Sequence, residues 1–415
     1  MPVDRRPSGG KRLATRGPCI LGREPLRPSG IAMLVAALDP ELYLKSSRTQ
    51  RRMGRVLAAN IAAALPGVET KRLAGHRLLV ETDHPDAVER LSTIFGIAAV
   101  EIVERLDATD LEVLADAVAE RMGSVVEGQS FAVRPRRIGT HEWNSQDLAV
   151  AAGARLVDAG GRVDLSNPEV TVVVRVVETT ADLTVERIPG AGGLPLGTQG
   201  QALVMFSGGI DSPVAAHMVA RRGVTLDYVH FSLGCGQADH AAAIAHDMSS
   251  RYGHGSDPLW IVCDIESAVP EITHRVDPRL RQMALKALMY LASEQIAGDL
   301  EDTRALVNGE SLGQVSTQTL DNLVSLDRLV DIPVLRPLIG LDKLEIRRRA
   351  EAIGTYEASA RSRELCDISQ GARVSVATRP GRLMDLGEAI DDLVAHAVTT
   401  AKHQRLRDWM PGSVV

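Results

Sequence analysis

The chain has 415 residues, of which 45% are hydrophobic, 24% charged and only 3% aromatic, and its formal net charge at pH 7 is −6. This length is too great for one ordinary core, so we expect several globular domains with cores of Ala, Val, Leu and Ile. No apolar run reaches the roughly 18 residues of a membrane span, and the basic N-terminus has no apolar signal core, so we expect no membrane partner and a cytoplasmic location.

The first segment, residues 1–40, is rich in Pro, Gly and Arg and is predicted to be an irregular extension. After it, apolar residues at helical spacing predict a helix over 48–65, and an apolar run at 78–80 predicts a strand before a second helix over 86–95. These elements form a small α+β unit over 41–105. The net charge does not indicate a nucleic-acid binder, yet this unit starts with a basic cluster that could contact phosphates or be only a solvated face: Lys45, Arg48, Arg51 and Arg52.

The next unit, residues 106–188, alternates helices and strands. Helical patterns occupy 107–122 and 144–160, a strand over 129–139 leads into a basic turn, and alternating residues over 168–188 predict a β-hairpin. The basic turn is a second candidate for phosphate contacts, and it consists of Arg134, Arg136 and Arg137.

A Gly-rich segment without room for a helix, residues 189–200, is predicted to be a linker. From 201 to 380 strands alternate with helices, which predicts a doubly wound parallel sheet, and residues 381–415 are expected to form a helical tail. The apolar runs that predict the strands are ALVMF (202–206), TLDYVHF (225–231), PLWIVCDI (258–265) and RALVNGE (304–310).

A tight turn, SGGIDS (Ser207–Ser212), directly follows the first of these strands. Gly208 and Gly209 tolerate backbone angles that other residues resist, and they bring bare N–H groups close to a ligand. A helix begins next, with Asp211 or Ser212 as its expected cap. Backbone N–H groups at a helix start bind anions, so we predict a phosphate ligand, while the absence of GK[ST] excludes a Walker A loop.

The four cysteines are widely spaced: Cys19, Cys235, Cys263 and Cys366. No CxxC occurs, so neither a zinc site nor an iron–sulfur cluster is predicted, and we assign no metal ligands. A lone cysteine is most often a small buried hydrophobe, and this is the expected role of the first three.

The SGGIDS loop resembles the pyrophosphate loop of ATP pyrophosphatases of the adenine-nucleotide α-hydrolase type. Longer stretches resemble the tRNA 4-thiouridine synthase family (tRNA sulfurtransferase, ThiI), namely Asn308–Leu323, Pro333–Glu357, the linker ERIPGAGGLPLGTQG and FAVRPRRIGTHEWNSQDL. The resemblance covers roughly Glu41 to Thr378. It implies an α/β fold with N-terminal ferredoxin-like and THUMP α+β domains, of which THUMP binds RNA, followed by a doubly wound parallel-sheet ATP pyrophosphatase (PP-loop) domain.

The resemblance implies a reaction for this chain. ATP adenylates O4 of the uridine at position 8 of tRNA, a persulfide sulfur attacks C4, and AMP leaves, so that 4-thiouridine forms. The implied cofactors are ATP and Mg²⁺; the implied partners are tRNA and a cysteine desulfurase or another persulfide or sulfide donor, with a homodimer left open. The chain ends at Val415 without the rhodanese domain that links many members to thiamine thiazole synthesis, so we expect the form that lacks this domain.

The resemblance also implies roles for single residues. Asp211 would hold Mg²⁺ or orient the phosphates, and Cys366 in SRELCDIS stands where the family carries its catalytic cysteine. Arg361 and Arg363 lie close to Cys366 in sequence and could favour its thiolate. Met205, Phe206, His230 and Phe231 would lie around the adenosine, and Lys286 would contact phosphate. Further nucleotide contacts are implied for Ser207, Gly208, Gly209, Ile210, Ser212, Gly309 and Gln318.

Several alternatives stay open at this point. Cys366 and His230 could be structural residues, and a thiol that resolves a persulfide could come from Cys263, Cys235 or another protein. The family's usual first strand corresponds here to ALDPELYLKSS (37–47), so we expect an altered strand there. The chain could also be another tRNA-modifying PP-loop enzyme, or a THUMP-containing RNA-binding protein without catalysis, although the intact SGGIDS loop favours an enzyme.

Overall fold

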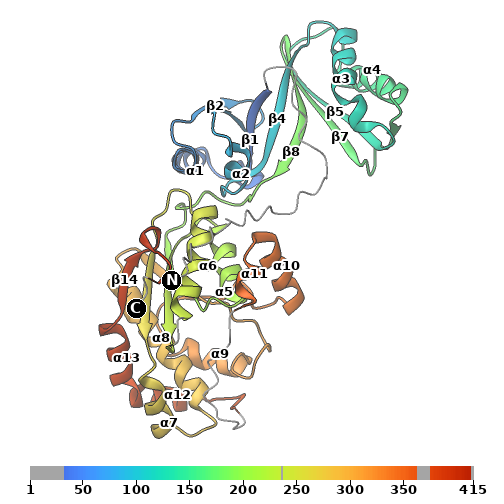
Figure 1. Cartoon of the computed structure of the whole chain (residues 1–415). Coiled ribbons are helices and arrows are strands. Elements are labelled where there is room, and N and C mark those ends of the chain that lie inside the picture. Colours follow the sequence, from blue (N-terminus) through green and yellow to red (C-terminus); the bar gives the residue numbers. More distant parts are fainter. Residues whose placement is uncertain (1–31, 235–236, 362–373, 413–415) are drawn as a thin grey trace, which may run out of the picture.

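Two β-sheets organise the chain in the computed structural model, which describes residues 32–234, 237–361 and 374–412 (Figure 1). An eight-stranded sheet forms the N-terminal half and a six-stranded sheet forms the C-terminal half. Across the described residues, no helix is both long enough and apolar enough to span a membrane.

The strands of the first sheet are β1 (Ala32–Leu38), β2 (Glu69–Leu73), β3 (Arg77–Glu81), β4 (Ile97–Asp107), β5 (Ser130–Ile138), β6 (Arg162–Val163), β7 (Val170–Val177) and β8 (Thr180–Pro189). They pair in the order β2-β3-β1-β4-β8-β7-β5-β6, antiparallel except where β5 runs parallel to β6 and β7. The accompanying helices are α1 (Ser47–Ala64), α2 (Ala87–Ser92), α3 (Leu111–Val126) and α4 (Ser145–Asp158), with a short 3-10 turn at Pro40–Leu42. The predicted hairpin is confirmed as β7 and β8.

The expectation of an irregular segment over residues 1–40 is wrong for its last part. Strand β1 lies there and pairs with β3 on one side and β4 on the other. Its sequence AMLVAAL is a continuous apolar run, and Val35 and Ala36, which point to opposite faces, are both 0% exposed. The Pro- and Gly-rich residues before it hid this signal. The chain therefore has a regular first strand, which includes only the first two residues of the stretch ALDPELYLKSS (37–47).

The predicted boundary between residues 41–105 and 106–188 falls inside one continuous sheet. Strands β4 and β8 pair from Ala99↔Pro189 to Asp107↔Thr180 and so connect the two units. Each unit keeps its own apolar core, one beneath α1 and α2 and the other beneath α3 and α4. The two expected α+β units are therefore present as two halves of a single sheet.

The strands of the second sheet are β9 (Gln201–Met205), β10 (Thr225–Ser232), β11 (Leu259–Asp264), β12 (Thr303–Val307), β13 (Val334–Leu335) and β14 (Lys402–Arg405). Their order is β13-β12-β9-β10-β11-β14, and every pair is parallel except β11 with β14. The predicted doubly wound parallel sheet is confirmed. The chain turns from one side of β9 to the other, and folds of this kind bind ligands at that position.

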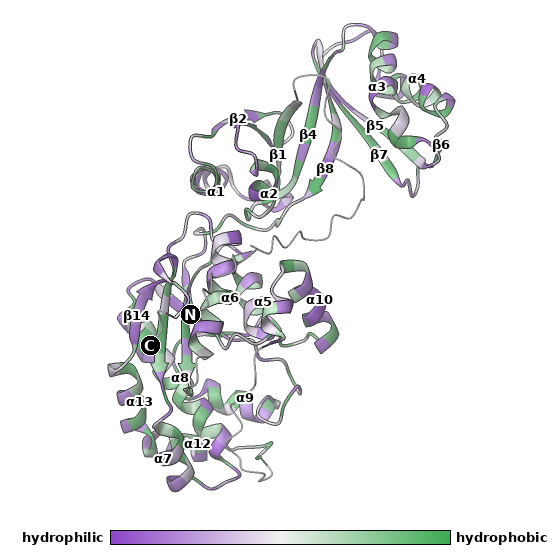
Figure 2. Cartoon of the chain, viewed as in Figure 1, coloured by the Kyte–Doolittle hydropathy of each residue, from purple (hydrophilic) through white to green (hydrophobic). Residues whose placement is uncertain are grey.

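Helices cover both faces of this sheet: α5 (Asp211–Ala220), α6 (Gln237–Tyr252), α7 (Ala268–Arg275), α8 (Arg281–Asp299), α9 (Leu320–Asp327), α10 (Lys343–Ile353), α11 (Tyr356–Ser359), α12 (Pro380–Ala389) and α13 (Asp391–Thr399). Helices α5, α6 and α10 share one apolar core with one face of the sheet, and α7, α8, α12 and α13 share the other. Helix α10 shows both purple and green residues in Figure 2, and it buries Ile346, Ala350 and Ile353, which lie on one side of a helix.

The C-terminal segment is more than the predicted helical tail. Helices α12 and α13 belong to the core around α8, and strand β14 extends the sheet by pairing antiparallel with β11, from Leu259↔Arg405 to Val262↔Lys402. Leu406, directly after β14, is 0% exposed. The strand sequence KHQR has no apolar alternation because it lies at the sheet edge, where charged residues are common.

The two halves of the chain are packed against each other beside α5 and α6. Phe95, between α2 and β4, belongs to the same apolar core as these helices. Its ring centroid lies 5.3 Å from that of His217 and 5.9 Å from that of Tyr252. Glu41 and Arg222 add two hydrogen bonds of 2.7 Å across this contact. The N-terminal half is thereby held against the helices that follow β9 and β10.

His217 should make this contact sensitive to acid. Burial, together with the charge of Arg221, lowers the pKa of His217 from 6.5 to about 4. Between these values the unfolded chain binds a proton that the folded chain excludes, so the free energy of unfolding should fall by about 2 kcal/mol from pH 7 to pH 5. Thermal unfolding of the wild type and of His217→Phe at both pH values checks this. The variant should lack this component, and an equal acid sensitivity of both proteins would contradict the assignment.

Candidate active site

The SGGIDS loop connects β9 to α5 and forms the predicted tight turn. Gly208 has a φ of 76°, and a Cβ at this position would lie 2.9 Å from the Cβ of Ala241 on α6, so only glycine fits. The two serines hold the turn together through hydrogen bonds within the loop. Ser207 N donates to Ser212 Oγ (3.2 Å), and Gly209 N donates to Ser207 Oγ (3.3 Å).

The start of α5 differs from the expectation. The helix begins at Asp211 with Ile210 at its N-cap position, and in the described structure no side chain caps it. The predicted capping by Asp211 or Ser212 is therefore wrong, because Asp211 is already in the helix and Ser212 Oγ accepts from Ser207. The first N–H groups of α5 and those of the loop together form a cradle whose chemistry fits a phosphate.

A second loop, from Asn308 after β12 to Gln318 before α9, packs against this cradle. Strands β9 and β12 are neighbours, so the loops that follow them meet at the same sheet edge. A Cβ on Gly309 would lie 2.9 Å from the carbonyl carbon of Asp211, so the two backbones are in close contact. Gln314 Nε2 donates to Asp211 Oδ2 (3.0 Å). The predicted nucleotide contacts Gly309 and Gln318 thus lie in a loop that is attached to Asp211.

Two of the implied adenosine contacts point into the core. The Phe206 side chain is 1% exposed and packs edge-on against Trp260. His230 is 3% exposed, and its Nδ1 donates to the Phe206 carbonyl (2.8 Å). Burial lowers the pKa of His230, so the ring is neutral, and its Nε2 has no partner among the described residues. A nucleotide can reach only the main chain of Phe206, whereas Met205 and Phe231 are half-buried at the strand ends.

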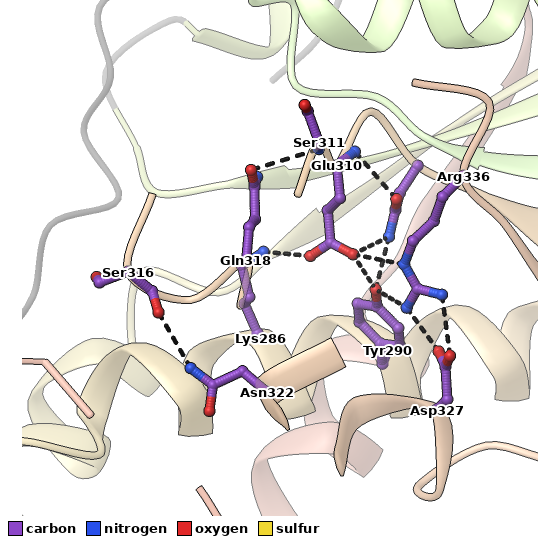
Figure 3. Close-up of polar contacts among 10 residues, drawn as sticks. Lys286, Tyr290, Glu310, Ser311, Ser316, Gln318, Asn322, Asp327 and Arg336 are labelled. Carbon is purple, nitrogen blue, oxygen red and sulfur yellow. Dashed lines mark hydrogen bonds and ion pairs between the residues drawn. The ribbon is translucent and has the colours of Figure 1, made fainter. Parts of the chain in front are cut away.

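A buried charged cluster lies beside the second loop (Figure 3). Its centre is the carboxylate of Glu310, which binds Lys286 of α8 and Arg336 of the segment after β13. Burial alone would raise the pKa of Glu310, but Lys286, Tyr290 and Arg336 together lower it to about 2. Lys286, the implied phosphate contact, is therefore held by a carboxylate that the sequence interpretation did not single out.

The implied catalytic cysteine, Cys366, lies outside the described residues, as do Cys19, Cys235 and Arg363. The described chain resumes at residue 374, where α9 anchors it: Asn322 Nδ2 donates to the Ser375 carbonyl (2.9 Å), and Thr378 N donates to Asn322 Oδ1 (2.9 Å). Because α9 directly follows the second loop, residues 375–378 lie near the candidate site.

Cys263 is the buried hydrophobe that the sequence predicts. Its side chain is 0% exposed on β11, in the core around α8, and burial raises the pKa of its thiol to about 12. Burial argues against the alternative that Cys263 resolves a persulfide in the folded protein, because a buried, protonated thiol is a poor nucleophile. In the part of the chain that the structure describes, no group of three or more His, Cys, Asp or Glu side chains is placed to hold a metal ion.

Helix α1 carries a row of exposed arginines three or four residues apart, which places them on one side of the helix. The row consists of Arg48, Arg51, Arg52 and Arg55. Arg55 was missed at the sequence level, although its spacing from Arg51 and Arg52 could have identified it. Lys45, also predicted to contact RNA, pairs with Glu41 at 3.3 Å.

The predicted basic turn is a piece of strand, since Arg134, Arg136 and Arg137 all lie within β5. Pairing with β7 extends β5 through this polar stretch, which had no apolar alternation to mark it. Alternation then places Arg134 and Arg136 on one face and Arg137 on the other, where Arg137 donates to His141 (3.0 Å). Arg136 lies in register with Arg175 of β7, so Arg175 joins the first face.

This geometry predicts that only one face of β5 contributes to RNA binding. Changing Arg134 and Arg136 to Gln should weaken tRNA binding and make the slope of log K against log salt shallower by about 1–2. The reason is that binding releases fewer counterions from the RNA when phosphate contacts are lost. Arg137→Gln is the matched control and should leave the slope unchanged. Filter binding over a salt series measures all three proteins. Equal slopes would mean that Arg134 and Arg136 are only a solvated face.

Comparisons with known proteins agree with this geometry. The family model of the thiamine biosynthesis protein ThiI matches residues 197–391, and the THUMP domain model matches residues 107–186. The chain is 39% identical over 336 residues to a tRNA sulfurtransferase of Desulfurococcus amylolyticus, an alignment that covers 79% of this chain and 69% of the relative. It is 36% identical over 376 residues to a tRNA sulfurtransferase of Pyrobaculum aerophilum, covering 89% and 76% of the two chains.

A solved structure has a similar fold. The crystal structure of a 4-thiouridine synthetase–RNA complex with bound ATP matches this chain with a TM-score of 0.77 at 25% sequence identity. The match covers 90% of this chain and 99% of the other. The likeness therefore extends over both sheets and not over the nucleotide loop alone.

Proposed function

The chain belongs to the tRNA sulfurtransferase (ThiI) family, and from this premise we propose that it uses ATP to convert the uridine at position 8 of tRNA into 4-thiouridine. The observation that carries the proposal is the uncapped start of α5 beside the SGGIDS loop, with the second loop bound to Asp211. The relative solved with RNA and bound ATP supports both substrates. Because the substrate is tRNA, we place the reaction in the cytoplasm.

The phosphate cradle suits the first chemical step. The carbonyl oxygen O4 of uracil is a poor leaving group, and attack of O4 on the α-phosphorus of ATP turns it into the leaving group AMP. Pyrophosphate departs in this step with a gain of negative charge. We assign the stabilisation of that charge to the N–H groups of Gly208, Gly209 and Ile210 and to the hydroxyls of Ser207 and Ser212.

Mg²⁺ fits the acidic side of this cradle. Asp211 offers a carboxylate at the start of α5, and ATP phosphates would supply further oxygen ligands, which is how proteins usually hold this ion. When bound there, Mg²⁺ neutralises charge on the departing pyrophosphate. The hydrogen bond from Gln314 orients the same carboxylate.

We assign sulfur transfer to Cys366. A persulfide on Cys366 attacks C4 of the adenylated base through its terminal sulfur, and AMP leaves. A second thiol then attacks Sγ of Cys366 and breaks its bond to the transferred sulfur, which frees 4-thiouridine and leaves Cys366 in a disulfide with the second thiol. A thiol reductant reopens this disulfide before the next turnover. Of the two thiols of this domain that were left open, Cys263 is buried and Cys235 lies outside the described residues. We propose that the second thiol is external, and that a cysteine desulfurase supplies the sulfur. The resemblance adds a homodimer as the assembly to test by light scattering.

Release of pyrophosphate tests this function against a non-catalytic RNA-binding role. Purified protein with ATP and Mg²⁺ should release pyrophosphate only when unmodified tRNA is present. A tRNA with cytidine in place of uridine at position 8 is the matched control and should give only background release. Tight tRNA binding without pyrophosphate release would favour the RNA-binding alternative, and equal release with both tRNAs would favour another PP-loop activity.

A further inference from the structure

Glu310 is the most densely hydrogen-bonded carboxylate of the cluster in Figure 3, and both of its oxygens have partners. Oε1 binds Lys286 Nζ, while Oε2 accepts from Tyr290 Oη (2.7 Å), Arg336 Nε (2.9 Å) and Asn308 Nδ2 (2.9 Å). The residue is only 5% exposed. A buried carboxylate with this set of donors has a single well-defined position.

The two cations of the cluster are not equivalent. Arg336 also makes two hydrogen bonds to Asp327, of 2.6 and 3.1 Å, so Asp327 balances its charge. Lys286 has Glu310 as its ion-pair partner, and within the described ranges no other acid pairs with it. The Lys286 side chain is 22% exposed against 6% for that of Glu310, so the ammonium lies on the outer side of the pair.

Glu310 belongs to the second loop, next to the point where this loop packs against the phosphate cradle. Gly309, the residue before Glu310, packs its backbone against Asp211 and Ser212 at the start of α5. Asn308 sits on the other side of Gly309, and its Oδ1 accepts from the Glu310 N–H (3.1 Å). The loop that contacts the phosphate cradle therefore also carries the carboxylate that fixes Lys286.

An ammonium group has three hydrogens, and one of them is engaged by Glu310. We propose that Glu310 is a positioning residue that holds the Lys286 ammonium at the wall of the cradle, with its remaining hydrogens available to the phosphate oxygens of ATP. This rests on the proposed function, because it assumes that ATP occupies the cradle. Tyr290, Asn308 and Arg336 fix Glu310 in turn, so the lysine does not need to be ordered by the nucleotide itself.

The test compares the KM for ATP in variants of Glu310 and Asp327, the two carboxylates that pair with Arg336. Glu310→Gln removes the charge that holds Lys286 and should raise the KM for ATP in tRNA adenylation about tenfold or more, as expected for loss of a charge-assisted contact. Lys286→Met should have a similar effect, and the double variant should be little worse than either single one. Asp327→Asn is the matched control, because it also removes a carboxylate charge that pairs with Arg336, whereas no ion pair joins Asp327 to Lys286 in the described part of the chain. Its KM for ATP should stay within about twofold of the wild type.

A purely structural role of Glu310 would change thermal stability without changing the KM for ATP. Equal losses of thermal stability in Glu310→Gln and Asp327→Asn with an unchanged KM for ATP would overturn the proposal, and so would fully additive effects of Glu310→Gln and Lys286→Met. If Glu310→Gln does not fold, Glu310→Asp decides, since its shorter side chain keeps the charge but withdraws from Lys286. Unchanged ATP binding by that variant overturns the proposal. A wild type that neither binds ATP nor adenylates tRNA would refute the proposed function itself.

Discussion

We expect Asp211→Asn to lower tRNA adenylation about a thousandfold while tRNA affinity stays within about twofold. The carboxylate of Asp211 lies at the first turn of α5, where it faces the phosphate cradle and accepts from Gln314 (3.0 Å). An electrostatic contact to a departing phosphate or its metal ion commonly contributes a factor of this size to the rate. Asn keeps the shape and can still accept from Gln314, so the loss reports the charge. Single-turnover formation of adenylated tRNA measures it.

Gln314→Ala is the control for the position of the second loop. This variant loses the hydrogen bond but keeps the Asp211 charge, so we expect a loss of several-fold rather than a thousandfold. Adenylation by Asp211→Asn at the wild-type rate would remove the carboxylate from the mechanism. A parallel loss of tRNA affinity would instead mean that the variant disturbs the fold.

Cys366→Ser should abolish 4-thiouridine formation from a persulfide donor but leave adenylation intact. The phosphate cradle makes the leaving group, whereas the thiol carries the sulfur, so the two steps depend on different residues. A serine hydroxyl cannot carry a persulfide and is not appreciably ionised at neutral pH. Adenylated tRNA should therefore accumulate in this variant when ATP is supplied, and mass spectrometry of the tRNA detects it.

Cys263→Ala is the matched control for the cysteine experiment. The Cys263 thiol is 0% exposed in the core around α8, so its removal should cost some stability and leave multiple turnover unchanged. Thiolation by Cys366→Ser at the wild-type rate would contradict the role of Cys366. Loss of multiple turnover in Cys263→Ala or in Cys235→Ala, with the first turnover intact, would contradict the external resolving thiol.

Much of the fold follows from local patterns in the sequence. The strands β9 to β12 are short apolar runs separated by helical patterns, and this order alone predicts the parallel sheet. The strands that were missed have weak patterns of their own. β1 follows a Pro- and Gly-rich stretch, and β14 is the polar edge strand KHQR, which is recognisable only by its pairing with β11. Tertiary pairing also carries β5 through the arginines that looked like a turn.

The candidate site also has features that local sequence predicts and features that depend on tertiary contacts. The Gly-Gly turn could be predicted because Gly208 needs a positive φ and has no room for a Cβ. The role of Glu310 could not be predicted, since its charged partners Lys286 and Arg336 come from α8 and from the segment after β13, which are distant in sequence. The absence of a side-chain cap on α5 depends on where the helix begins: it starts at Asp211, so both predicted caps lie inside the helix and Ile210 holds the N-cap position.

The most direct test of the central claim is nucleoside mass spectrometry of unmodified tRNA after incubation with the purified protein, ATP, Mg²⁺ and a persulfide donor. We predict that one uridine, at position 8, gains the mass of an oxygen-to-sulfur exchange, and that the product is 4-thiouridine. We further predict that omission of ATP, or the Cys366→Ser variant, gives none. An unmodified uridine 8 with an active donor and folded protein, or sulfur incorporated at another position, would contradict the account.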